Sequence, residues 1–206
     1  MITNEKFEEA RPFLHLDDAY ILLHETSPEN VNSILEGGLR LKKDYNGKIK
    51  KILTIPKNEN EIKNYYYHII DKSSIIVLGI PNVVFGDIQQ NTTYSTLFLN
   101  CLAEFEEKQN ISDNSFNNLR YQKLASTISN KWIIGYFDVD SNFIINNNYI
   151  MNQENYTQLI EAEKEKLMNE FRRRYPSVYM ELSEISKGSQ YTVRGVDPYN
   201  RNHYDY

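Results

Sequence analysis

The chain has 206 residues, of which 40% are hydrophobic and 25% are charged, a balance typical of one folded unit rather than of a disordered or fibrous protein. Its formal net charge of −5 lacks the basic excess of a general nucleic-acid binder, so nucleic acid is not the expected partner. Cys101 is the single cysteine, which excludes an internal disulfide and a thiolate zinc site; no metal is expected.

The hydropathy of the chain bears on where it acts. No stretch reaches the roughly 18 consecutive apolar residues that a spanning helix needs, so no membrane partner is expected. Residues 1–11 are polar and acidic and lack the apolar segment of a signal peptide. We therefore expect a soluble protein that is cytoplasmic, or that is secreted into a host or target cell without a classical signal peptide.

The first predicted elements are a short polar helix at residues 5–14 and a buried strand at residues 19–24, a short apolar run without a breaker. A second helix follows at once. Ser27 suits its N-cap and Pro28 its first helical position. Gly37 and Gly38 then give the chain a left-handed exit from this helix.

Further strands and helices alternate along the rest of the chain. The pattern predicts strands at residues 52–55, 73–81 and 132–139, and helices at residues 58–71, 96–109 and 154–174. Glu170 and Arg174 are one turn apart on the last helix and are expected to pair. The tyrosine-rich stretch at residues 186–206 has no period. We predict a domain over residues 1–150, with residues 151–206 packed on it or extending it.

The stretch from Tyr20 to Leu39 carries the most specific pattern. A strand ends in His24-Glu25-Thr26-Ser27, and a helix with Glu-Asn near its start, Ile-Leu in its middle and Gly-Leu after its end follows. This stretch resembles the first motif of the ADP-ribosyltransferase family. The resemblance implies an α/β (α+β) fold built on a split, mixed β-sheet flanked by helices, and NAD as substrate.

The same resemblance implies that His24, Glu25 and Thr26 line the NAD site. A histidine at the end of a buried strand can donate a hydrogen bond to a ribose hydroxyl and accept another locally, and Thr26 adds a hydroxyl beside it. If no such helix followed, we would prefer a structural role for His24, in which its ring hydrogen-bonds a backbone carbonyl and fixes the strand end.

In the family a second strand and its helix help to form the nicotinamide pocket. Thr54, Tyr65 and Tyr66 stand at corresponding places, where a hydroxyl would orient the ribose and an aromatic ring would stack on nicotinamide. The Gly-x-Tyr or Ser-x-Ser pattern of that strand is absent from this chain. Tyrosines at such helical positions more often belong to core and surface.

The third family motif is a glutamate on or just before a later strand, often preceded two residues earlier by Glu or Gln. Gln122 lies near the expected place but carries no charge. Glu104 and Glu106 have the right spacing but fall within the predicted helix 96–109, where positions two apart diverge. Asp138 and Asp140 end a predicted strand, where positions two apart share a face, although a solvated strand end explains them as well. Glu106, Asp138 and Gln122 are the catalytic candidates.

The expected function is mono-ADP-ribosyl transfer from NAD to a macromolecule, a protein by preference, by a bacterial toxin or effector. Two alternatives stay open. One is a non-catalytic module of the same fold that binds NAD, ADP-ribose or a protein partner, which the missing glutamate favours. The other is an RNA 2′-phosphotransferase, which shares the fold but uses arginines for phosphate; the acidity of the chain argues mildly against it.

Overall fold

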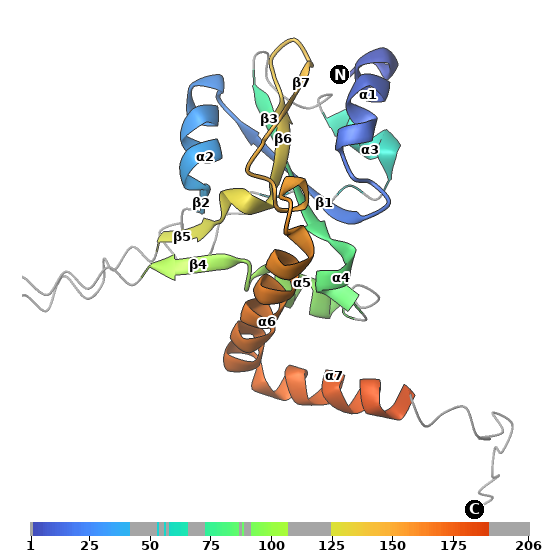
Figure 1. The fold of residues 1–206 in the computed structure, drawn as a ribbon, viewed down its shortest axis with the longest axis vertical. Coiled ribbons are helices and arrows are strands. Elements are labelled where there is room, and N and C mark those ends of the chain that lie inside the picture. The colour runs from blue at the N-terminus through green and yellow to red at the C-terminus, as the bar shows by residue number, and fades with distance from the viewer. Residues whose placement is uncertain are drawn as a thin grey trace, which may run out of the picture.

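A computed structural model of the chain describes residues 2–41, 53, 56, 58–65, 73–86, 88, 92–106 and 125–189. These residues form two antiparallel β-sheets with helices around them, as Figure 1 shows. The predicted strand at residues 52–55 and the tail from residue 190 onward lie outside the described residues. No described helix is both long enough and apolar enough to cross a membrane.

The first sheet has four strands in the order β1-β3-β6-β7. These are β1 (Ala19–Thr26), β3 (Ser74–Pro81), β6 (Ile133–Phe137) and β7 (Phe143–Ile145), and every neighbouring pair is antiparallel. All eight positions of β3 are buried, which fits its continuous apolar sequence and its place between β1 and β6. The strands predicted at residues 19–24 and 73–81 are thereby confirmed, and β1 continues to Thr26.

The second sheet has three strands in the order β2-β5-β4. These are β2 (Leu39–Leu41), β4 (Ala103–Glu106) and β5 (Ala125–Ile128), and both pairings are antiparallel. In Figure 1 its strands run across those of the first sheet. The predicted combination of β-strands and helices is therefore observed. The prediction of mixed strand directions is wrong for the described strands, because all their pairings are antiparallel.

Five short helices are described around the two sheets. They are α1 (Asn4–Ala10), α2 (Val31–Gly37), α3 (Glu59–Asn64), α4 (Asn82–Phe85) and α5 (Thr92–Leu99). The Thr3 side chain caps α1, which ends at Ala10 and passes into a 3₁₀ turn at Arg11–Phe13 that contains Pro12. The helix predicted at residues 5–14 is thus two elements. Asn58 caps α3, as the predicted start of that helix requires.

The helix predicted at residues 96–109 is wrong beyond Leu99. There α5 ends, and the Cys101 and Leu102 amides bond to the carbonyls of Phe98 and Leu99 in tight turns. Arg174 then donates to the carbonyl of Asn100 at 2.6 Å, which helps to satisfy the end of the helix. Ala103–Glu106 join the second sheet as β4, so strand pairing overrides the apolar spacing on which the helix was predicted, and residues 107–109 lie outside the described residues.

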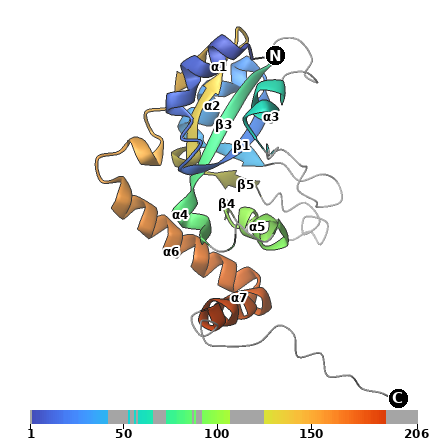
Figure 2. The same cartoon turned by 90° about the vertical axis from the view of Figure 1, so that its right-hand side faces the viewer.

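Two helices close the described chain. The 19-residue α6 (Tyr156–Arg174) confirms the predicted amphipathic helix and buries Ile160, Leu167 and Phe171. A sharp turn at Tyr175 leads to α7 (Pro176–Ser189), which runs away from α6 in Figures 1 and 2 and was not predicted. Pro176 stands at the first position of α7, where its lack of an amide hydrogen costs nothing.

A ladder of aromatic rings joins the sheet to α6. Tyr20 of β1 contacts Phe85, Phe85 contacts Phe98 of α5, and Phe98 contacts Phe171, with ring centroids 4.8, 5.2 and 5.7 Å apart. The three phenylalanines are fully buried. The helix α6 therefore belongs to the same core as the sheets.

Candidate functional site

The end of β1 holds three of the predicted NAD-binding residues. His24 and Thr26 are half-buried, while Glu25 is exposed and accepts a hydrogen bond from the Ser73 hydroxyl at 2.9 Å. His24 pairs with Ile76 and Thr26 with Ser74 in the register of β1 and β3. The three residues thus stand at the sheet end at which β1 stops and β3 starts.

The connection from β1 to β2 follows the predicted order. A 3₁₀ turn at Pro28–Asn30 begins at Ser27, although the Ser27 side chain forms no cap, and α2 continues from Val31. Gly38 has a φ of +80°, which confirms the left-handed exit. A side chain there would also collide with the carbonyl oxygen of Ile128 in β5, so only glycine permits this approach.

Two asparagines fix the junction between the sheets. Asn130, just after β5, donates to the carbonyls of Leu35 and Glu36 at 3.0 and 3.1 Å and so holds the last turn of α2. Asn146, after β7, donates to the carbonyls of Asn130 and Ile133 at 3.1 and 2.9 Å. These contacts connect α2, β6 and the segment after β7, and sequence reasoning did not identify them.

Asp138 lies at the same sheet end as Thr26, one residue beyond β6. Its Oδ1 accepts from the amides of Asp140 and Asn142 at 2.9 and 2.8 Å, and its Oδ2 accepts from the Asn142 side chain at 3.1 Å. The expectation that Asp138 and Asp140 share a strand face is wrong, because β6 ends at Phe137 and both residues lie in the turn to β7. Asp138 organises that turn.

Glu104 and Glu106 lie on β4 of the second sheet, not on a helix. Glu104 pairs with Thr127 and Glu106 with Ala125 in β5. The two glutamates therefore stand two positions apart on a strand. Positions two apart belong to the same face of a sheet. The reason for setting this pair aside, its helical geometry, does not hold.

The remaining predicted residues are spread over other elements. Tyr65 caps the end of α3, is half-buried and packs against the core. Thr54, Tyr66 and Gln122 lie outside the described residues. Of the predicted site residues that are described, His24, Glu25, Thr26 and Asp138 share one sheet end.

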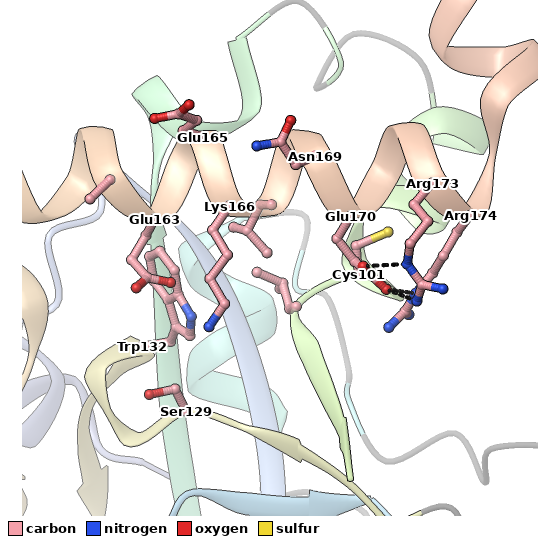
Figure 3. A pocket seen from close by; sticks show the side chains of 13 residues that line it. Cys101, Ser129, Trp132, Glu163, Glu165, Lys166, Asn169, Glu170, Arg173 and Arg174 are labelled. Atoms are coloured by element: carbon pink, nitrogen blue, oxygen red, sulfur yellow. Dashed lines mark hydrogen bonds and ion pairs between the residues drawn. The ribbon is translucent and has the colours of Figure 1, made fainter. Parts of the chain in front are cut away.

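A pocket of about 640 Å³ lies elsewhere, under α6, and we call it the α6 pocket. Its lining comes from α6, from the turn after α5 and from the segment between β5 and β6, as Figure 3 shows. Trp132 is in this lining and precedes β6, whereas Tyr136 is in register with Ile76 and His24. The pocket is thus near the opposite end of β6 from the predicted NAD site, and no sequence motif indicated it.

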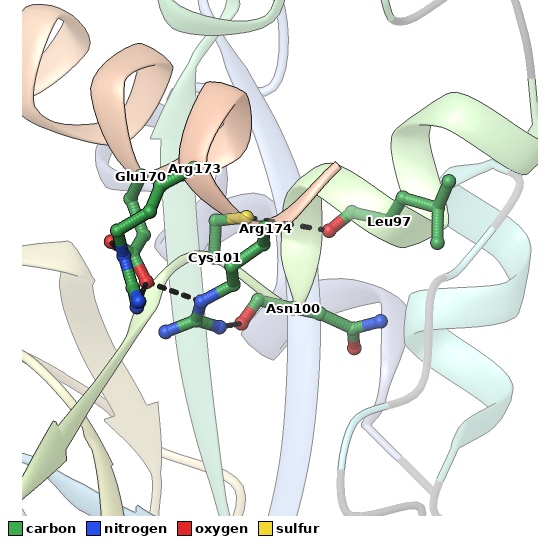
Figure 4. Close-up of polar contacts among 6 residues, drawn as sticks. All are labelled: Leu97, Asn100, Cys101, Glu170, Arg173 and Arg174. Atoms are coloured by element: carbon green, nitrogen blue, oxygen red, sulfur yellow. Dashed lines mark hydrogen bonds and ion pairs between the residues drawn. The ribbon is translucent and has the colours of Figure 1, made fainter. Parts of the chain in front are cut away.

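Two groups of ion pairs lie beside the α6 pocket. Lys131 pairs with Glu163 close to the middle of α6, and Arg173 and Arg174 pair with Glu170 near its end, Arg173 through contacts of 2.7 and 2.9 Å. The predicted pairing of Glu170 with Arg174 is confirmed. Hydrogen bonds from Arg173 and Arg174 lower the pKa of Glu170 to about 2, against the opposing effect of burial. Figure 4 shows how Arg174 also reaches the Asn100 carbonyl.

Cys101 lies in the same pocket, where burial favours the protonated form of its thiol. Its sulfur is buried 3.7 Å from the carbonyl oxygen of Leu97, and burial raises the pKa of the thiol to about 11. A thiol that remains protonated at neutral pH is a poor nucleophile and metal ligand. Within the described part of the chain, no group of three His, Cys, Asp or Glu residues could hold a metal ion.

Comparisons of the chain with protein-family models, with curated proteins and with solved structures found no match.

Proposed function

We propose that the chain binds NAD at the end of β1 and transfers its ADP-ribose to a protein acceptor. One observation carries the proposal: a half-buried histidine and threonine end a buried strand, and a short helix with an obligatory glycine exit follows them. This is the order of features in the family motif that the sequence resembles. The division of the strands into two sheets is consistent with it.

In the proposed reaction His24 and Thr26 hold the nicotinamide ribose through hydrogen bonds. The bond between C1′ and the nicotinamide nitrogen breaks, and its electron pair leaves with nicotinamide. A lone pair of the acceptor forms the new bond at C1′, and the acceptor loses a proton. Positive charge develops on the ribose meanwhile, so a carboxylate near C1′ would lower the barrier.

Glu106 is the preferred carboxylate, with Glu104 as its partner two residues earlier. Their place on β4 supports this choice, since the family glutamate stands on or just before a strand and can follow another glutamate at this spacing. Asp138 is less suited, because both its oxygens already accept hydrogen bonds in the turn after β6. Gln122 would bind the ribose without supplying charge.

The first experiment measures NAD binding by titration calorimetry and by thermal melts. NAD well above its dissociation constant should raise the melting temperature, because a ligand of the native state adds stability by mass action. His24→Ala should weaken NAD binding by about 1–3 kcal/mol. The melting temperature without NAD should stay unchanged. If the melting temperature falls and NAD affinity does not, His24 is a structural tie.

The second experiment measures the transfer of label from NAD to the components of a cell lysate. Glu106→Gln should lower transfer by a factor of about 100–1,000 and leave NAD binding nearly intact. Glu104→Gln tests the other glutamate of the same strand. Asp138→Asn tests the alternative carboxylate, and Asp140→Asn is its control. Full transfer by all four amide variants would show that the carboxylate is misassigned.

A non-catalytic NAD-binding or ADP-ribose-binding module is the second candidate. The observation that favours it is the absence of a carboxylate from residues 118–130, the segment that leads through β5 toward β6. NAD binding without transfer to any lysate component, and without hydrolysis of NAD, would support this candidate over the transferase.

A further inference from the structure

Ser74, the first residue of β3, is a buried polar residue whose hydroxyl has no hydrogen-bond partner among the residues that the structure describes. It is only 2% exposed. Asn146, the other buried polar residue of the described chain, both donates and accepts hydrogen bonds through its side chain. A hydroxyl removed from water without a partner costs free energy of folding, so the unpaired hydroxyl of Ser74 requires an explanation. A polar ligand would supply the missing partner.

The register of β1 and β3 places Ser74 on the same face of the sheet as the proposed NAD-binding residues. Ser74 stands directly opposite Thr26, and Ile76 stands directly opposite His24. Opposed residues of an antiparallel pair share a face, with Cβ atoms about 4.5–5.5 Å apart, and positions two apart on a strand also share a face. The Thr26 hydroxyl likewise has no partner in the described part of the chain. Two neighbouring hydroxyls beside His24 are therefore available to a ligand.

Ser73, the residue before Ser74, has the opposite arrangement. Its hydroxyl donates to the Glu25 carboxylate at 2.9 Å. Glu25 is one position from Thr26, and successive residues of a strand point to opposite faces, so this contact lies on the other face of the sheet. Ser73 thus joins the ends of β1 and β3, whereas the Ser74 side chain forms no described bond that holds the two strands together.

We infer that Ser74 is a further ribose-binding residue, whose hydroxyl, together with that of Thr26, hydrogen-bonds the hydroxyl groups of the nicotinamide ribose. The inference rests on the proposed function, because it needs NAD at the end of β1. Serine and ribose hydroxyls can each donate and accept, so a bond in either direction satisfies both groups. The buried hydroxyl of Ser74 then costs stability in the free protein and gains its partner only when NAD is bound.

Ser74→Ala separates this role from a structural one through two measurements on the full chain. Thermal melts without NAD should give an unchanged or higher melting temperature, because the substitution removes an unpaired buried hydroxyl. Titration calorimetry should give an NAD affinity about fivefold lower, the usual effect of losing one hydrogen bond. A serine that bonds a buried water instead would give the reverse result, a lower melting temperature at unchanged NAD affinity.

Ser73→Ala is the matched control, because it removes the hydroxyl of the neighbouring residue on the other face. Its NAD affinity should equal that of the parent. Weaker NAD binding by Ser74→Ala alone, without a loss of melting temperature, supports the inference. Unchanged NAD affinity of Ser74→Ala, a loss of affinity together with a lower melting temperature, or equal effects of the two substitutions would overturn it while the parent still binds NAD. If the parent binds no NAD, the proposed function fails together with the inference.

Discussion

Asn146 is a buried polar side chain, only 5% exposed, at the junction of the two sheets. Its amide group donates to the carbonyls of Asn130 and Ile133, and its oxygen accepts from the amide of Asn148 at 3.1 Å. Removing such a buried amide costs more free energy of unfolding than its hydrogen bonds contribute on folding. The reason is that its former partners stay buried without hydrogen bonds.

We therefore expect Asn146→Ala to lower the free energy of unfolding by about 2–4 kcal/mol. Urea denaturation followed by circular dichroism would measure the change. Asn147→Ala is the control, because Asn147 is exposed in the same segment, and its substitution should stay within about 0.5 kcal/mol of the parent. Equal effects of the two substitutions would contradict a special role for Asn146.

The pKa of Cys101 gives a second prediction for a single residue. Burial raises this pKa to about 11, and thiol reagents attack through the thiolate. Alkylation of the native protein should thus be slow at pH 8 and accelerate up to about pH 11. In the chain unfolded by urea, the thiol should have its ordinary pKa and should therefore be alkylated fast. Rapid labelling of the native protein at pH 8 would show that α6 opens frequently.

At the scale of the element, α6 is held to the body by apolar contacts and by Arg174, which donates to the Asn100 carbonyl and also pairs with Glu170 of the same helix. The pKa of Glu170 falls from 4.5 to about 2 in the folded protein because Arg173 and Arg174 hold its charged form. A carboxylate with a lowered folded pKa adds stability above its unfolded pKa and loses it as the pH falls toward the folded value. The ion pairs are partly exposed, so we expect a contribution of only about 1 kcal/mol.

Glu170→Gln should accordingly lower the free energy of unfolding by about 1 kcal/mol at pH 7. The difference from the parent should shrink between pH 4.5 and about 2, where Glu170 of the folded parent becomes protonated. Chemical denaturation at several pH values would measure it. Glu161→Gln on the exposed side of α6 is the control and should show no such pH dependence.

The elements that sequence reasoning found are those with local signals. The strands β1 and β3 are short apolar runs, α6 has apolar residues at helical spacing, and Gly38 marks the exit from α2. The strand β4 was mistaken for helix because its pairing with β5 depends on residues about twenty positions away. Sequence could predict the cluster His24 to Thr26 because it is contiguous. It could not predict the α6 pocket, whose lining comes from three separate segments.

At the scale of the whole molecule, α6 completes the core, whereas the α7 residues that pack against it, Val178, Tyr179 and Leu182, are only partly buried. Ile160, Leu167 and Phe171 of α6 are buried in the common core, each worth about 1.5–3 kcal/mol when buried. The described contacts of α7 are chiefly with α6, including the Arg172 guanidinium that lies 4.5 Å above the Tyr179 ring and donates to its hydroxyl.

A chain ending after Tyr175 should therefore keep cooperative thermal unfolding and the circular dichroism of the sheets. A chain ending after Ile150 should lose cooperative unfolding, because it exposes the floor of the α6 pocket and Phe98 of the aromatic ladder. Differential scanning calorimetry distinguishes the two outcomes. An unchanged melting temperature for the shorter chain would mean that residues 1–150 fold as a separate domain.

The strand order also has a consequence for how the protein is made. Leu22 pairs with Leu78, and Leu39 pairs with Ile128, so neither β1 nor β2 has a neighbour in its sheet close by in the chain. On the ribosome β1 must wait for β3, and the second sheet must wait for β5, while apolar strand edges stay open to wrong partners. Such remote pairing predicts slow folding, in roughly milliseconds to seconds after dilution from urea. Synthesis is therefore the stage at which this protein most needs protection by a chaperone.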